Sequence, residues 1–170
     1  ETVSLSAPDY GLLGRLIHEE TNLARQRHGL APLQRLGPLE SASREHSRNM
    51  VQRSFFSHVD PAGAAPAQRV RAQGLRPAYV AENIAQVFAR DYRSGEQVYI
   101  RGEGPATVFS REPGGSQLRL RTYGEVAAQV VADWLASPGH RANVLGTHGT
   151  HHGAGCALER PEVSAMPMFV

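Results

Sequence analysis

The sequence contains no lysine, and all 18 of its basic residues are arginine. This absence excludes a Schiff-base lysine, a phosphate-loop lysine and a Ser/Lys catalytic dyad. The net charge is only +2, and the arginines are scattered rather than gathered in a run interleaved with aromatic residues. The sequence therefore predicts no nucleic-acid partner.

Cysteine occurs once, at Cys156, so no internal disulfide can form and the CxxC metal and redox motifs are excluded. The surrounding segment 153–158 is small and apolar, which predicts a buried strand. Because a buried thiol without a charged partner is usually packed and unreactive, we expect Cys156 to be inert rather than nucleophilic.

Long apolar runs are also missing. None reaches the ~20 residues that a membrane-spanning helix needs, so no membrane span is expected. The length of 170 residues and the apolar fraction of 41% are typical of one globular domain over residues 1–170. The chain begins with Glu1 rather than methionine, which fits either a removed signal peptide or a cloning choice.

Four segments carry the apolar spacing of a helix, at residues 10–28, 38–53, 66–73 and 125–137. Prolines in the first turn and glycines or prolines after the last turn mark their ends. Pro138 and Gly139 cannot continue the last of these helices. We therefore expect His140 to follow the helix in a rigid turn.

Residues 86–123 have a different pattern, with strand-like alternation at 97–101, 107–110 and 117–123. Clusters of glycine and proline separate these stretches. They predict a β-hairpin or meander inserted between the segment around Glu82 and the last helix. With a closing strand at 166–170, the fold class is α+β.

Three polar residues are candidates for a site. Glu82 lies in the apolar segment 79–85, which predicts the start of a strand, and a carboxylate there must be paired or hydrogen-bonded. His58 lies at the start of a polar loop, just after a pair of phenylalanines, and His140 follows the last helix. The alternative for His140 is a structural role in a turn, bonded to a neighbouring carbonyl. The alternative for Glu82 is a helix cap or a hydrogen bond to a neighbouring backbone group.

The remaining histidines are weaker candidates. His18 begins an HExxH zinc motif, but Asn22 stands where the second histidine is required, so the motif fails. His46 lies on the inward stripe of the second helix, which predicts a hydrogen-bonded core residue. Three histidines lie in the glycine-rich stretch 146–153, but a dedicated metal site would add ligands on rigid elements.

Three segments occur in the order and spacing of one known family. They are 55–61 (Phe-Phe-Ser-His-Val-Asp-Pro), 81–85 (Ala-Glu-Asn-Ile-Ala), and Trp134 followed by 137–145 (Ser-Pro-Gly-His-Arg-Ala-Asn-Val-Leu). They resemble the CAP superfamily of cysteine-rich secretory proteins, antigen 5 and pathogenesis-related proteins, in its bacterial branch of SCP-like extracellular domains. The resemblance covers the chain apart from residues 86–123.

The resemblance implies a three-layer α-β-α sandwich with a small antiparallel sheet, and a cleft lined by two histidines and two acids. His58 and His140 match the two histidines, and Glu82 matches the first acid. Ser137 stands where eukaryotic members carry the second acid. Glu125 lies on the same helix more than two turns earlier, too far away to replace it.

Two imidazoles and a carboxylate, His58, His140 and Glu82, suit a divalent metal such as zinc. Because the second acid is missing, we expect weak metal binding and no catalysis. The predicted function is a secreted, extracellular or periplasmic, non-catalytic module that binds a lipid, a cell-wall component or a protein. Two alternatives stay open: a protease-like, metal-dependent hydrolase using the same cleft, and a purely structural cluster of the three residues.

Overall fold

A computed structural model describes residues 1–159 and 166–170 of the chain. The helices agree closely with the sequence prediction, and their bounds are α1 Tyr10–Arg27, α2 Gly37–Gln52, α3 Pro66–Ala72, α4 Tyr123–Ala136 and α5 Pro138–Val144, with a short 3-10 helix at Gly104–Ala106. The one unexpected α-helix among them is α5. Pro138 does end α4, as predicted, but it then occupies the first turn of a new helix, where its missing N–H costs nothing.

The strands described are short and form three separate sheets. Their bounds are β1 Gln34–Arg35, β2 Val87–Phe88, β3 Tyr99–Arg101, β4 Val108–Ser110, β5 His151–His152, β6 Leu158–Glu159 and β7 Met168–Phe169. β7 lies between β2 and β6 in an antiparallel sheet, β1 pairs with β5 in parallel, and β3 pairs with β4 in an antiparallel hairpin. The predicted closing strand at 166–170 is therefore present, although shorter.

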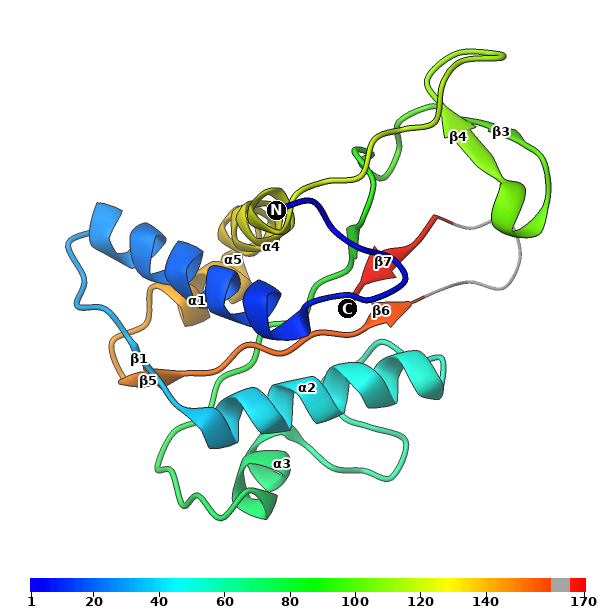
Figure 1. Cartoon of the computed structure of the whole chain (residues 1–170). Helices are drawn as coiled ribbons and strands as arrows, with labels where there is room; N and C mark the ends of the chain where they lie inside the picture. The colour runs from blue at the N-terminus through cyan, green and yellow to red at the C-terminus, as the bar shows by residue number, and fades with distance from the viewer. Residues whose placement is uncertain (160–165) are drawn as a thin grey trace.

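The elements are arranged in layers (Figure 1). Helices α1, α4 and α5 lie on one side, α2 and α3 lie on the other, and the chain from β5 to β6 runs between them. This arrangement confirms the α+β fold class with small sheets between helical layers. In the described part of the chain, no helix is both long and apolar enough to cross a membrane.

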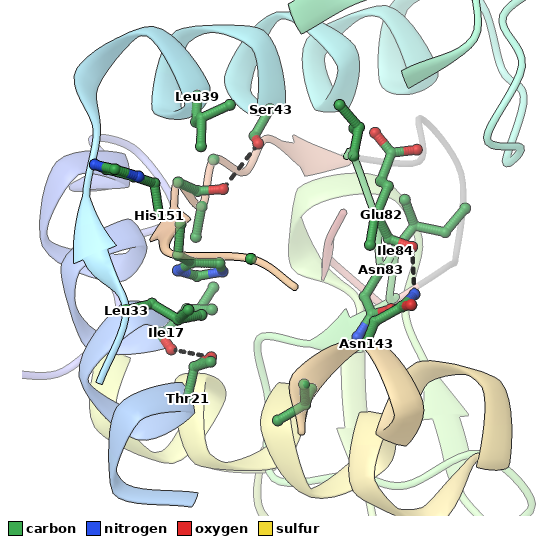
Figure 2. A pocket seen from close by; sticks show the side chains of 18 of the residues that line it. Ile17, Thr21, Leu33, Leu39, Ser43, Glu82, Asn83, Ile84, Asn143 and His151 are labelled. Atoms are coloured by element: carbon green, nitrogen blue, oxygen red, sulfur yellow. Dashed lines mark hydrogen bonds between the residues drawn. The ribbon is translucent and has the colours of Figure 1, made fainter. Parts of the chain in front are cut away.

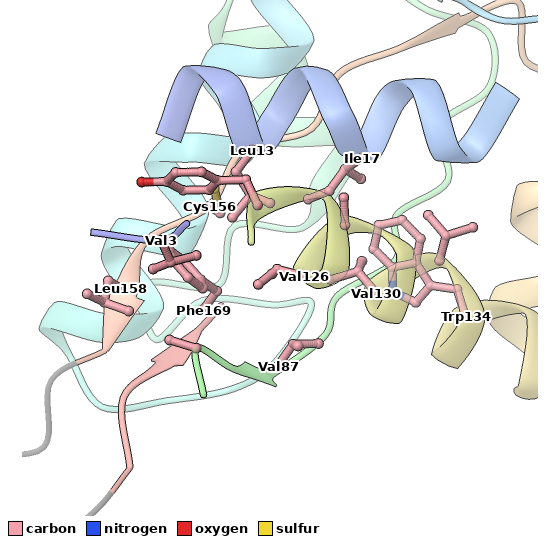
Figure 3. Close-up of a cluster of buried hydrophobic side chains, with 14 of the residues drawn as sticks. Val3, Leu13, Ile17, Val87, Val126, Val130, Trp134, Cys156, Leu158 and Phe169 are labelled. Atoms are coloured by element: carbon pink, nitrogen blue, oxygen red, sulfur yellow. The ribbon is translucent and has the colours of Figure 1, made fainter. Parts of the chain in front are cut away.

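The main core lies between α1, α4 and the antiparallel sheet (Figure 3). Leu13 from α1 and Val126 from α4 are fully buried. Burying each such side chain stabilises the folded state by about 1.5–3 kcal/mol relative to leaving it exposed. Tyr123 is buried beside them, and its hydroxyl accepts a hydrogen bond of 2.7 Å from the backbone N–H of Asp9. The N-terminal segment is thereby attached to the start of α4.

The middle layer passes very close to α2. A Cβ at Gly153 or Gly155 would collide with the α2 backbone, so only glycine allows this approach. The carbonyls of the two glycines accept hydrogen bonds from Ser43 and Ser47 of α2, at 3.0 and 3.2 Å. Because these carbonyls accept hydrogen bonds from a helix and not from a neighbouring strand, most of the strand predicted over 153–158 does not form, and only its last residue, Leu158, belongs to a strand, β6.

The region 86–123 is more divided than predicted. Its hairpin, β3–β4, stands apart from the sandwich (Figure 1), but β2 at its start belongs to the central sheet. The third predicted strand, 117–123, is reduced to two isolated bridges, between Leu120 and Arg90 and between Thr122 and Thr2. The segment 79–85, predicted to be the start of a strand, is a loop, and strand β2 begins only at Val87.

Candidate functional site

A cavity of about 590 Å³ opens between α1, α2, the loop 75–86 and the segment 146–156. Figure 2 shows Ile17, Leu33 and Leu39 on one side of it and Glu82 and Ile84 on the other. Its volume lies in the range of small-molecule binding sites. The family resemblance implied a cleft at Glu82, but no sequence pattern indicated the rest of this cavity, because the residues that line it come from separate stretches of the chain.

The wall is mostly apolar, and several of its polar groups are engaged within the protein. Thr21 donates its hydroxyl hydrogen to the carbonyl of Ile17 at 2.8 Å, within α1. The buried guanidinium of Arg25 donates to the carbonyls of Ala31, Val144 and Gly146, at 2.7–2.9 Å. These contacts satisfy the polar groups without using the cavity.

Glu82 lies at the rim and has two partners. Oε1 of Glu82 is 2.9 Å from Nδ1 of His58, and Oε2 is 2.6 Å from Nη2 of Arg69. Arg69 also donates to the backbone carbonyls of His58 and Ala64, at 2.9 and 2.7 Å. The requirement that Glu82 be paired is therefore met. The sequence could not single out Arg69 from the other arginines.

The loop that carries Glu82 is fastened to α5 by two asparagines. Asn83 donates from its side-chain amide to the carbonyl of His140 at 3.0 Å, and Asn143 donates to Oδ1 of Asn83 at 2.8 Å. Figure 2 shows the contact between the two asparagines. Both asparagines lie in the family-like segments, but the sequence assigned them no role.

His140 and Ser137 are placed differently from expectation. His140 lies in the first turn of α5 rather than in a rigid turn after α4, because the chain resumes a helix at Pro138. Ser137 is the boundary residue of both helices, and its carbonyl accepts the backbone N–H of Arg141 at 2.8 Å. The segment is thus positioned by its backbone.

The structure joins His58 to Glu82 directly, whereas the link to His140 passes through the amide of Asn83 and the His140 carbonyl. Within residues 1–159 and 166–170, no three His, Cys, Asp or Glu side chains are grouped so that they could hold a metal ion. Both oxygens of Glu82 are also occupied by partners. The zinc site and the binding role of these residues stay predictions.

His46 is a core residue, as predicted. It is 2% exposed, and its Nε2 donates to the carbonyl of Ser57 at 2.9 Å. Burial, with the charge of Arg69 nearby, lowers the pKa of its imidazole. His46 therefore holds the loop before His58 against α2 as a neutral group.

Cys156 is inert, as predicted. It is 3% exposed, and burial raises the pKa of its thiol to about 12. The reactive thiolate is therefore scarce at neutral pH.

A second polar cluster lies on the opposite side of the cavity. Nδ1 of His18, on α1, is 3.1 Å from Nδ1 of His152, on β5, and the two rings are inclined by only 23°. Burial lowers the pKa of both imidazoles, that of His152 to about 4, with the charges of His18 and Arg25 contributing. Neither histidine was expected to be a ligand, and no spacing in the sequence links the two.

Two solved structures resemble this fold. An extracellular protein containing a SCP domain, from Bacillus anthracis strain Ames, superposes with a TM-score of 0.50 at 18% identity, over 94% of this chain and 40% of that one. An outer surface protein from Borrelia burgdorferi superposes with a TM-score of 0.50 at 15% identity, over 91% of this chain and 86% of that one. At these identities the likeness shows the fold alone.

Curated relatives and a family profile extend the comparison. The uncharacterized protein YkwD of Bacillus subtilis (strain 168) is 27% identical over 81% of this chain, and the uncharacterized membrane protein YlbC of the same organism is 27% identical over 79%. The chain spans only 39% and 29% of their lengths. The profile of the CAP, or cysteine-rich secretory protein, family matches residues 18–164. Because this match extends over most of the sequence, the chain belongs to the CAP family.

Proposed function

We propose that this CAP domain is an extracellular, non-catalytic binding module that takes a ligand with an apolar body into the cavity beneath Glu82. The observation that carries the proposal is the cavity itself, with about 590 Å³ of space lined largely by aliphatic side chains. A pocket of this size and lining is typical of sites that enclose a small apolar molecule. Among a lipid, a cell-wall component and a protein, this favours a lipid-like ligand.

The rim supports binding over hydrolysis. A hydrolase needs a group at the site that is free to move protons. Here the carboxylate of Glu82 is engaged on both oxygens, by His58 and by Arg69, and Ser137 replaces the second acid. These contacts favour a structural role for the rim residues, which hold the loops together.

The proposal that this protein is extracellular rests on the two solved structures that share its fold. One structural neighbour is described as an extracellular protein and another as an outer surface protein. Both carry the same fold, so we assign the same compartment to this chain.

Trp134 provides the test. It is the only tryptophan, it lines the cavity, and its indole N–H donates to the carbonyl of Ile84 at 3.3 Å. Titration with indane, a small bicyclic hydrocarbon, should shift the Trp134 emission saturably. Leu39→Phe, which fills part of the cavity, should weaken binding at least several-fold.

The matched control is Leu23→Phe. Leu23 lies on α1 but is 42% exposed and does not line the cavity. This variant should bind indane as the wild type does. Absence of saturable binding, or equal weakening by both substitutions, would overturn the proposal.

The zinc prediction is tested separately by calorimetry. The wild type, His58→Ala and His140→Ala are titrated with zinc, and peptide and ester hydrolysis is followed in parallel. Zinc-dependent turnover that both substitutions abolish would favour the hydrolase over the binding module. Unchanged zinc affinity in both variants would remove His58 and His140 as ligands.

A further inference from the structure

The hydrogen bonds around His18 fix the position of its proton. Asn22, one turn further along α1, accepts the backbone N–H of Leu33 on Oδ1 at 2.8 Å and donates from Nδ2 to the Leu33 carbonyl at 3.0 Å. Since a backbone N–H only donates and a carbonyl only accepts, the orientation of the Asn22 amide is determined. The second hydrogen on Nδ2 then points to Nε2 of His18, 3.0 Å away.

The protonation of His18 determines which nitrogen of His152 is protonated. Because Nε2 of His18 accepts a hydrogen from Asn22, a neutral His18 carries its own proton on Nδ1. That proton is donated to Nδ1 of His152 at 3.1 Å, so Nδ1 of His152 is unprotonated. A neutral His152 must therefore carry its proton on Nε2.

The Nε2–H of His152 belongs to a ring that lines the cavity. Of the two stacked rings only that of His152 lines the cavity, and Nε2 lies across the ring from the nitrogen that faces His18. No hydrogen bond among the described residues uses this nitrogen. By contrast, the neighbouring guanidinium of Arg25 is engaged by three backbone carbonyls.

We propose that His152 presents a fixed, neutral N–H donor to the cavity and that the ligand is an apolar molecule carrying a neutral carbonyl oxygen, as in a ketone or an ester. The proposal rests on the proposed function and adds the chemical class of the ligand. Because the cavity as a whole is lined mostly by apolar groups, a carbonyl that enters it is desolvated and gains from a donor that is already oriented.

The orientation of the donor is tested in the unliganded wild type. Nuclear magnetic resonance of the protein with 15N-labelled histidine should show His18 protonated on Nδ1 and His152 protonated on Nε2 at pH 7. Addition of 1-indanone should shift the Nε2 resonance of His152, whereas indane should not. The opposite tautomer of His152, or no selective shift, would overturn the proposal.

The choice of ligand is tested with the same pair of molecules, which differ by one carbonyl group. The ratio of the Kd of indane to that of 1-indanone should be about threefold to tenfold smaller in His152→Phe than in the wild type, which corresponds to the loss of one hydrogen bond. His28→Phe, at an exposed position that does not line the cavity, is the control and should leave the ratio unchanged.

The outcomes separate the two proposals. Saturable indane binding with the same ratio in the wild type and in His152→Phe would refute the carbonyl donor and leave the binding cavity intact. Failure of both molecules to bind would refute the proposed function and this inference together.

Discussion

Two polar clusters each contribute one residue, Glu82 or His152, to the lining of the cavity. They compensate the burial of polar groups in different ways. The rim cluster, defined as His58, Glu82 and Arg69, is ionic and joins two loops to α3. The wall cluster, defined as Asn22, His18 and His152, is neutral and joins α1 to β5. The side chain of His58 is 46% exposed, whereas burial holds His18 and His152 in their uncharged forms.

The difference follows from solvent access. At the rim, water and a second charge can compensate the cost of an ion, so a carboxylate is tolerated. In the wall, a charged group would lose its hydration without gaining a partner of opposite charge. Neutral groups, each of which donates a hydrogen bond to the next, are therefore favoured there. The rim cluster therefore holds loops together, and the wall cluster is the better candidate for contacting an apolar ligand.

The largest expected effect is the response of the wall cluster to acid. The pKa of His152 is lowered to about 4 from its ordinary 6.5, so the folded state binds fewer protons than the unfolded state. The stabilisation is complete above pH 6.5 and is lost as the pH falls from 6.5 towards 4, by roughly 3 kcal/mol. Urea unfolding across this range should show the loss, and His152→Phe should reduce it. An equal loss in the variant would contradict this assignment.

Removing the charge that holds the rim together should have the next largest effect. Arg69→Met keeps an aliphatic chain but leaves Oε2 of Glu82 and two backbone carbonyls without this donor, so the free energy of unfolding should fall by about 2–3 kcal/mol. Arg71→Met, at an exposed position of the same helix, should change it by less than about 0.5 kcal/mol. Equal effects in chemical denaturation would show that Arg69 is not the central residue of the rim.

Replacing Asn22, the first residue of the wall cluster, should lower the free energy of unfolding by less than replacing Arg69, because Asn22 carries no charge. Asn22→Leu removes the two hydrogen bonds to Leu33 and the one to His18, and about 1–2 kcal/mol of stability should be lost. Gln26→Leu, on the exposed face of α1, serves as the control in the same urea titrations. Asn22→Leu should also leave His152 as a mixture of tautomers, visible in its 15N resonances. If His152 kept a single, unchanged tautomer in this variant, Asn22 would not be what fixes the tautomer of His152.

The smallest expected effect is at the exposed member of the rim. His58→Ala should lower the free energy of unfolding by about 0.5 kcal/mol, since solvent screens a pair with one exposed partner. Added salt should reduce even this difference between the variant and the wild type. A loss as large as that of Arg69→Met would make His58 and Arg69 equal partners of Glu82.

Much of the fold could be predicted because helix signals are local. The apolar spacing and the proline and glycine stops placed α1, α2, α3 and α4 within about two residues of their observed ends. The prediction missed α5 because Pro138 both ends one helix and suits the first turn of the next. The start of a strand was predicted too early, in the loop 79–85, because apolar spacing does not show where a partner strand lies beside the chain.

The candidate site was only half predictable. The contact between His58 and Glu82 was anticipated, because the resemblance named both residues and a carboxylate among apolar residues requires a partner. Arg69 and the wall cluster were missed. Their residues lie in unrelated parts of the sequence, and no spacing rule connects His18 with His152.

The sequence by itself determined the helices, the family, the inert Cys156 and the need for a partner at Glu82, since each depends on neighbouring residues or on recognisable segments. Only the tertiary structure decided which cation pairs with Glu82, where the cavity lies and which nitrogen of His152 carries a proton. These properties depend on distances between atoms far apart along the chain, and hydrogen bonds act over only about 3 Å.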